Sequence, residues 1–310
     1  MRLTKLFTWV IFCAVCAFAA GPVRAQQPQP AAPQRVAGRI VVARVAGTVT
    51  ATNTTDKTSR QLANNDVVAQ NYVVTTTAGS SAVLVFSNGA TVNVGSNSVL
   101  SIDEFLQDPF AQDLHVSDLK EEPSSSTTKL NLSRGELVGN VKHLHEDKGS
   151  SFTVNTPVGA AGIRGTTFRI VFTPDASGKV TFSLQTADGQ VLFTGTTNTQ
   201  VHVDAGTQIT ATVEAKVDAT TNTVTVTSAP TITSTQTLSA DQQTTIATAT
   251  QEAVDAAKTV IIQSTTSTSG STPSNSDTQN KDTTKSKDTT TGSSATSGNS
   301  STTSLDGSGG

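Results

Sequence analysis

The stretch Phe152–Phe172, FTVNTPVGAAGIRGTTFRIVF, decides the fold, because it contains two strand patterns joined by small residues. The run FTVN at 152–155 alternates apolar and polar residues, and FRIVF at 168–172 again places large apolar residues at every second position. Such alternation is typical of strands that bury one face. Proline removes a donor from a strand ladder, so we expect the first strand to end near Thr156-Pro157. The small residues between the two strands predict a bend.

Strand patterns continue on both sides of this stretch and predict an all-β domain. The Asn88-Gly89 pair lies between apolar runs and predicts a tight hairpin, because both residues accept positive φ. We expect Gly47 to form a bend or a bulge, and Asp188-Gly189 to begin a chain reversal. The expected architecture is a two-layer antiparallel β-sandwich or a flattened β-roll, with one C-terminal helix and a disordered tail.

Two surface features interrupt the strand patterns. Residues 105–122 are acidic and irregular, so we predict an inserted loop there. Residues 213–226 alternate apolar residues with Thr and charged residues, which predicts an edge hairpin that turns at 218–222. An edge strand can pair with another chain, so self-association remains open.

Composition divides the chain into five parts. Residues 1–25 combine a basic start, an apolar run and a small-residue cleavage motif, as a secretory signal peptide does. A Gln/Pro/Ala linker follows at 26–35, and the β-domain is expected over 36–230. A helical segment is expected over 231–263, and the Ser/Thr-rich tail at 264–310 should be disordered.

The C-terminal helix has a clear start signal. Ser239 and Gln242 form the pattern of a capping box, in which each side chain bonds to the backbone of the other residue. Apolar residues then recur at helical spacing and predict a helix over 240–262 that packs on its own domain. They are Ile246, Ala249, Ala253, Ala257 and Val260.

Charge and cysteine content limit the classes of partner. The 310 residues include 21 basic and 24 acidic ones, and removal of the signal peptide takes away three basic residues, which leaves a net charge of −6. A mildly acidic surface argues against nucleic acid or anionic lipid as the main partner. Cys13 and Cys16 both lie in the signal peptide, so we expect no disulfide in the mature chain. No other segment approaches the ~20 apolar residues of a spanning helix, so we expect export to the periplasm, the cell surface or the medium, with no membrane-spanning segment once the signal peptide is cleaved. Retention of the uncleaved apolar run as an anchor is the alternative.

Few residues suggest chemistry. His143 and His145 would share one face of a strand and form a weak candidate metal site, but the spacing fixes no third ligand, and an exposed turn is the competing interpretation. No nucleophile elbow, catalytic triad or apolar carboxylate pair stands in the sequence. We therefore expect neither a cofactor nor enzymatic activity.

The stretch at 152–172 resembles the FecR-type domain of bacterial envelope proteins, in which a Thr-Pro step precedes an apolar-Arg-Gly-Thr-x-Phe run. The resemblance covers about Val45 to Ala211, and Asn65 stands where the family usually has glycine. Asparagine tolerates a left-handed backbone, so the turn should survive. The segments that carry the resemblance are Thr156-Pro157, Ile163–Phe168, Leu62–Asp66, Val73–Thr75, Gly79–Gly89, Gly95–Ile102 and Gln200–Gln208.

The resemblance implies a binding role. The best-known family members relay a signal from an outer-membrane transporter to a sigma factor, through a cytoplasmic anti-sigma segment, a membrane helix and a periplasmic FecR domain. Here a signal peptide is expected in place of the first two parts. The resemblance thus implies an exported, non-catalytic module that binds a protein or ligand in the cell envelope, as a signalling or scaffold component. The alternative is a structural or surface-matrix protein that is anchored or spaced by its Thr/Ser-rich tail.

A recognition bend is the candidate binding site. It comprises Thr156, Pro157, Arg164, Gly165 and Thr166. Arg164 carries a guanidinium that either pairs within the fold to hold the bend or binds a carboxylate of the envelope partner, and the first role is favoured.

Overall fold

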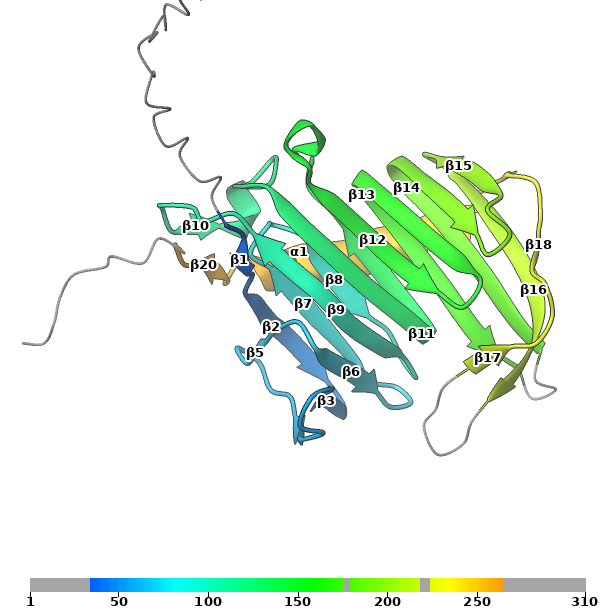
Figure 1. The fold of residues 1–310 in the computed structure, drawn as a ribbon, viewed down its shortest axis with the longest axis horizontal. Helices are drawn as coiled ribbons and strands as arrows, with labels where there is room; N and C mark the ends of the chain where they lie inside the picture. Colours follow the sequence, from blue (N-terminus) through cyan, green and yellow to red (C-terminus); the bar gives the residue numbers. More distant parts are fainter. Residues whose placement is uncertain (1–33, 176–178, 218–223, 265–310) are drawn as a thin grey trace, which may run out of the picture. The chain divides into compact units, whose positions relative to one another are not determined.

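The computed structural model describes residues 34–175, 179–217 and 224–264 (Figure 1). The predicted signal peptide, most of the linker, the tail after Ser264 and the predicted turn at 218–222 lie outside these residues. The elements are β1 Val36–Ala37, β2 Ile40–Ala46, β3 Val49–Asn53, β4 Ser59–Gln61, β5 Val67–Val68, β6 Tyr72–Thr76, β7 Ser81–Phe86, β8 Thr91–Val94, β9 Val99–Gln107, β10 Leu114–His115, η1 Val116–Asp118, β11 Ser126–Asn140, η2 Glu146–Lys148, β12 Ser151–Thr156, β13 Gly159–Pro174, β14 Lys179–Gly195, β15 Gln200–Asp204, β16 Thr207–Val217, β17 Val224–Val226, β18 Thr231–Ile232, β19 Gln236–Thr237, α1 Ala240–Ala257 and β20 Ile261–Ile262.

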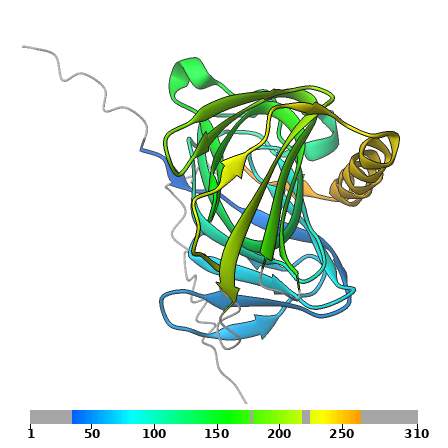
Figure 2. The same ribbon diagram turned by 90° about the vertical axis from the view of Figure 1, so that its right-hand side faces the viewer.

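Two layers of strands face each other across the hydrophobic core (Figure 2). Layer one has the order β4-β3-β6-β9-β11-β12-β13-β14-β15, and layer two has the order β5-β2-β7-β8-β11-β13-β14-β16. The expected all-β, two-layer architecture with one C-terminal helix is confirmed. One pair departs from the antiparallel pattern, since β11 and β12 run parallel.

The long strands β11, β13 and β14 contribute to both layers because each bends at a glycine. The bends lie at Gly135, Gly165 and Gly189, with φ of 100°, 58° and 76°, values that side-chain-bearing residues adopt only with strain. The predicted reversal at Asp188-Gly189 is wrong. Both halves of β14 pair with β13, so the chain crosses from layer two to layer one there and does not turn back.

Three other turn predictions are confirmed. Asn88-Gly89 joins β7 to β8, with φ of 87° at Gly89. Gly47 has φ of 72° and joins β2 in layer two to β3 in layer one. Asn65 takes the left-handed conformation, with φ of 68°, as expected of a residue that stands in for glycine.

Alternation along the strands fills the space between the layers. Apolar residues of β12 and β13 point inward, and their polar neighbours point outward. Burying one large apolar side chain contributes roughly 1.5–3 kcal/mol to the free energy of unfolding, so the buried phenylalanines are major contributors to the stability of the roll. The phenylalanines that are almost fully buried are Phe86, Phe105, Phe152, Phe168, Phe172, Phe182 and Phe193.

The outer face of layer two is partly apolar, and α1 covers it. Val83 and Val85 of β7 cluster with Ala253 and Ala257 of the helix. The predicted capping box is present, since the Ser239 hydroxyl accepts a bond from the Gln242 backbone N–H and the Gln242 side chain accepts one from the Ser239 backbone N–H.

The predicted helix end at residue 262 is wrong. The helix stops at Ala257, and Ile261–Ile262 form β20, which pairs with β10. The β-branched run from Thr259 to Ile262 explains the early end, because β-branched residues favour strands.

The inserted loop begins and ends three residues later than predicted. Phe105 and Gln107 belong to β9 and are fully buried. Phe105 packs edge-on against Phe86, and the Gln107 side chain accepts a bond from the Ser87 hydroxyl at 2.6 Å. The insertion proper runs over 108–125 and contains β10 and η1.

The predicted hairpin at 213–226 forms between β16 and β17. It is not a free edge, however. The outer side of β16 also pairs with β18 and β19, which belong to the segment that leads to the helix.

Candidate functional site

The chain crosses between the two layers along two opposite edges of the roll. We call one the serine edge, defined by Gly47, Ser80, Ser98 and Gly135. We call the other the loop edge, defined by the insertion at 108–125, the connection at 141–150 and the bends at Gly165, Gly189 and Gly206.

The serine edge satisfies its own backbone. Ser80 Oγ accepts a hydrogen bond from the Thr48 N–H at 2.9 Å. Ser98 Oγ accepts one from the Glu136 N–H at 2.9 Å and lies 3.2 Å from the Glu136 carbonyl oxygen, to which it donates. These hydroxyls replace ladder partners where strands leave one layer for the other, so their role is structural.

The structure does not gather the predicted recognition bend at one place. Residues 159–164 form a strand, so the prediction of one bend is wrong. Thr156 and Pro157 form the tight turn between β12 and β13, where Thr156 Oγ1 donates to the Gly159 carbonyl at 2.8 Å. Arg164 and the residues after it lie at the opposite end of this hairpin. Small residues misled the prediction, because they permit close packing in a strand as well as a bend.

The second half of the predicted bend lies at the loop edge. Thr166 is buried, and its hydroxyl donates to the Gln190 carbonyl at 3.0 Å, which ties the β13 bend to the β14 bend. Arg164 Nη1 lies 3.4 Å from Glu146 Oε2, and the two side chains are 59% and 44% exposed. Arg164 therefore has a partner within the fold, as favoured from the sequence, but the exposed pair leaves the guanidinium accessible.

The two candidate metal ligands separate into different environments. His143 is exposed and lies beside the Gly165 bend. His145 is half-buried, and its Nε2 lies 2.9 Å from the Glu122 carbonyl oxygen. Within the ranges that the structure describes, no group of three or more His, Cys, Asp or Glu side chains gathers to hold a metal ion.

Glu122 is the residue that sequence reasoning missed. It is only 1% exposed, and its carboxylate accepts bonds from the Ser126 hydroxyl at 2.6 Å and the His145 backbone N–H at 2.7 Å. It thus ties the insertion to the connection at 141–150. Glu121 next to it is exposed, and nothing in the local sequence distinguishes the two.

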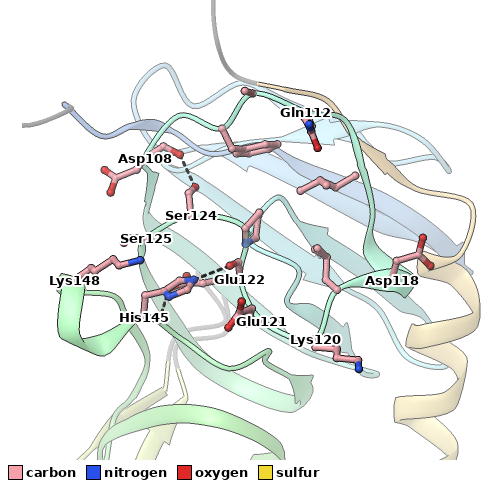
Figure 3. Close-up of a pocket in the computed structure, with 15 residues that line it drawn as sticks. Asp108, Gln112, Asp118, Lys120, Glu121, Glu122, Ser124, Ser125, His145 and Lys148 are labelled. Atoms are coloured by element: carbon pink, nitrogen blue, oxygen red, sulfur yellow. Dashed lines mark hydrogen bonds between the residues drawn. The ribbon is translucent and has the colours of Figure 1, made fainter.

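A cavity of about 860 Å³ opens between these two segments (Figure 3). Phe110, Leu114 and Leu119 supply apolar surface, while charges of both signs stand around it. The charged residues labelled in Figure 3 belong to the insertion and to the 145–148 segment. The charged lining residues are Asp108, Asp118, Lys120, Glu121, Glu122 and Lys148.

Lys142 adds an unusual amine to the loop edge. Its side chain packs beside Gly89 and Leu119, and burial lowers the pKa of its ammonium group below the ordinary value. Within the described residues, the Lys142 ammonium group forms no hydrogen bond or ion pair with the protein.

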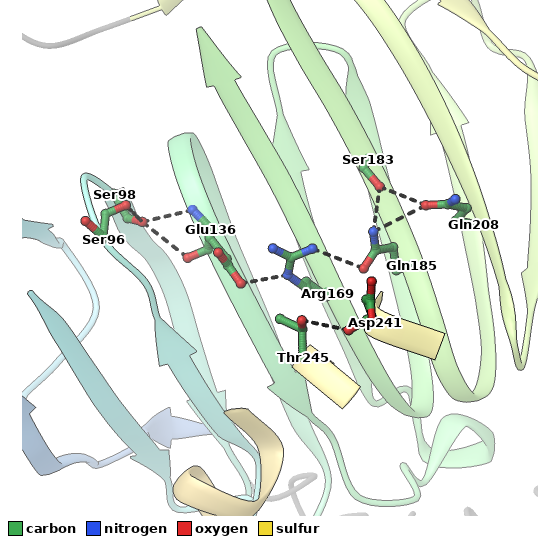
Figure 4. A network of polar contacts seen from close by, with 9 residues as sticks. All are labelled: Ser96, Ser98, Glu136, Arg169, Ser183, Gln185, Gln208, Asp241 and Thr245. Atoms are coloured by element: carbon green, nitrogen blue, oxygen red, sulfur yellow. Dashed lines mark hydrogen bonds and ion pairs between the residues drawn. The ribbon is translucent and has the colours of Figure 1, made fainter. Parts of the chain in front are cut away.

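A second polar cluster lies on the outer face of layer two, beneath the N-terminal half of α1 (Figure 4). Arg169 Nε donates to Glu136 Oε1 at 2.6 Å, and Nη1 donates to Gln185 Oε1 at 3.2 Å. Gln208 Oε1 accepts bonds from Gln185 Nε2 at 3.2 Å and from Gln242 Nε2 of the helix at 2.8 Å. These bonds link the sheet to the first turn of α1, so the cluster has a structural role.

No helix within residues 34–175, 179–217 and 224–264 is long and apolar enough to cross a membrane.

Comparison with known proteins gives one family. Residues 72–191 match the family model described as FecR protein. Two crystal structures of a candidate anti-sigma factor from Parabacteroides distasonis ATCC 8503 are similar to 51% of this chain, with 14% and 13% identity and TM-scores of 0.32 and 0.31. The similarity spans 59% of that protein. No curated protein matches the chain.

Proposed function

Since residues 72–191 form a FecR domain, we propose that this protein is an exported, non-catalytic module that binds a protein partner in the bacterial cell envelope, in signalling or as a scaffold. The composition of residues 1–25, with its basic start and apolar run, supports export.

The cavity at the loop edge is the observation that carries the proposal. The insertion at 108–125 contributes little to the main core, yet it is held in place by β20, by the buried Glu122 and by Phe110. A fold that fixes an extra segment in this way presents a preformed surface. Apolar surface with a polar, charged rim is the usual anatomy of a protein interface.

The polar groups near the cavity support binding over catalysis. The Glu122 carboxylate and the His145 ring are the pair with catalytic potential, and both are engaged in holding backbone groups of the two loops. A general acid or base needs a free proton site facing the substrate. The exposed charges of Asp118, Lys120 and Glu121 are suited to complementary contacts with a partner.

The test is a pull-down from envelope extract with tagged residues 26–310. The same chain ending after Ser264 tests the tail, because it keeps every described residue, including Ser264, whose backbone N–H donates to Asp113 of the insertion. Glu121→Lys reverses a charge at the cavity rim, and Glu214→Lys makes the same change on exposed β16, away from the cavity. We expect a discrete partner that the truncated chain and Glu214→Lys retain and Glu121→Lys loses.

A structural or matrix role is the alternative, and its basis is the Ser/Thr-rich composition of residues 264–310. It predicts that the full chain recovers cell-wall material and that truncation after Ser264 abolishes this recovery. That outcome, or equal partner recovery by Glu121→Lys and Glu214→Lys, would contradict binding at the cavity.

A further inference from the structure

The outermost strands of the two layers differ in how they are protected from pairing with another chain. In layer two, β17, β18 and β19 pair with β16. In layer one, β4 is only three residues long, and its Arg60 bonds back to Asp66, at 2.7 Å. Short strands, charges and covering segments are the usual ways of preventing edge pairing. The strand β15 at the other end of layer one pairs with β14 alone and has no lysine, proline or bulge.

The hairpin geometry fixes which backbone groups of β15 face outward. The Gly195 N–H donates to the Thr199 carbonyl at 2.9 Å, so residues 195 and 199 form a hydrogen-bonded pair. Such pairs alternate along an antiparallel ladder. The N–H and C=O groups of Gln200, His202 and Asp204 therefore point away from β14. Among the described residues these groups have no backbone partner on that side. The Asp204 carbonyl accepts a bond from the Thr207 hydroxyl at 2.7 Å, and a carbonyl oxygen can accept a second one.

This edge is complementary to itself. A two-fold axis through His202 pairs a second β15 in antiparallel fashion, so that outward groups meet outward groups. Gln200 then lies opposite Asp204 of the second copy, and an amide donor faces a carboxylate. Half-buried Val201 lies opposite buried Val203, which continues the core across the junction. About six backbone hydrogen bonds would form.

We propose that β15 is a homodimerisation edge, through which two copies of this chain join layer one into a continuous antiparallel sheet. The inference is independent of the proposed function, because β15 is separate from the loops that line the cavity. A two-fold contact is closed, so it gives dimers and not filaments. The exposed side chains of Gln200, His202 and Asp204 line the outer face of the junction.

A charge-swap experiment at the axis tests the proposal. His202→Glu and His202→Lys each place like charges directly opposite one another in the dimer, and like pairs destabilise cross-strand contacts. Analytical ultracentrifugation of residues 26–310 should show a concentration-dependent dimer, which either substitution weakens up to about fivefold. An equimolar mixture of the two variants should restore association, because glutamate then faces lysine. Restoration also shows that both variants are folded.

The matched controls are Thr196→Glu and Thr196→Lys, in the exposed turn before β15. They should leave association unchanged. Hydrogen exchange gives an internal control, since the His202 amide should become protected as concentration rises, whereas the Val201 amide already faces β14 and should not change. A monomer at ~1 mM protein, or a dimer that both His202 variants keep unchanged, would overturn the proposal.

Discussion

At the serine edge, β11 crosses between layers at Gly135 in direct contact with Ser98, whereas at the loop edge β13 crosses at Gly165 beside an exposed histidine. A Cβ added at Gly135 would lie 2.4 Å from the Ser98 Cα, but one added at Gly165 would lie no closer than 3.3 Å to His143. The crossing at Gly135 is thus more tightly packed than the crossing at Gly165, although the Gly189 bend at the loop edge is also tight, since an added Cβ would lie 2.6 Å from the Gly165 carbonyl oxygen. The serine edge bonds to its own backbone through Ser80 and Ser98, whereas the loop edge holds the insertion, the cavity and the accessible charges.

The largest expected effect on stability is at the serine edge. Gly135→Ala should lower the free energy of unfolding by about 2–4 kcal/mol, because the methyl group clashes with Ser98 and φ is 100°. Chemical denaturation measures the loss. Gly162→Ala is the control, since its nearest non-neighbouring atom would lie at 3.6 Å, and it should cost less than about 0.5 kcal/mol. Equal losses for both would show that the serine edge is not specially packed.

At the loop edge, Glu122 is buried and hydrogen-bonded, so Glu122→Ala should lower the free energy of unfolding by about 2 kcal/mol. The substitution leaves the Ser126 hydroxyl and the His145 N–H without their buried acceptor. Glu121→Ala removes an exposed carboxylate from the neighbouring position and should be within about 0.5 kcal/mol of the parent. Thermal or urea unfolding of the two variants separates the buried role from simple loss of charge.

A direct comparison of the two crossings uses Gly165→Ala. Its cost should be about 1 kcal/mol, smaller than at Gly135, because φ is 58° and the neighbouring atoms need only small shifts. Gly165→Asn should cost less than Gly165→Ala, since asparagine tolerates this region best after glycine. A cost at Gly165 that matches the cost at Gly135 would remove the distinction between the two edges.

The smallest expected effect belongs to Arg164. Arg164→Ala should change the free energy of unfolding by less than about 0.5 kcal/mol, because the pair with Glu146 is exposed. The same variant should be compared with the parent in the envelope pull-down. Reduced partner recovery at unchanged stability would place Arg164 in the binding surface, and a stability loss above 1 kcal/mol would instead assign it to holding the bend.

Local patterns in the sequence predicted the elements that depend on local physics. The Asn88-Gly89 hairpin and the Ser239–Gln242 capping box form as expected, since turn and cap preferences act within a few residues. Gly189 was misread, because a glycine that bends a strand between layers looks like one that reverses the chain. Only the pairing of both strand halves with β13 distinguishes them, and that pairing involves distant residues.

The candidate site was less accessible to sequence reasoning than the fold. Arg164 was selected from the sequence, but it does not line the cavity, which is built mainly by residues 108–125, whose composition is that of an exposed loop. The burial of Glu122 depends on a hydrogen bond from His145, which lies 23 positions away. Neighbouring Glu121 has the same side chain and the opposite environment. Tertiary contacts therefore decide which carboxylate is structural.

The pairing of β10 with β20 links the cavity to the order in which the chain is made. Asp113 receives its bond from Ser264, which lies 151 positions later in the sequence. Chains emerge from synthesis amino terminus first, so the roll can assemble while the insertion still lacks its last strand. The cavity wall is then the final part of the described fold to be completed. Loss of the residues after α1 would leave the insertion without β20, so a finished cavity requires a chain that has been synthesised at least as far as Ser264.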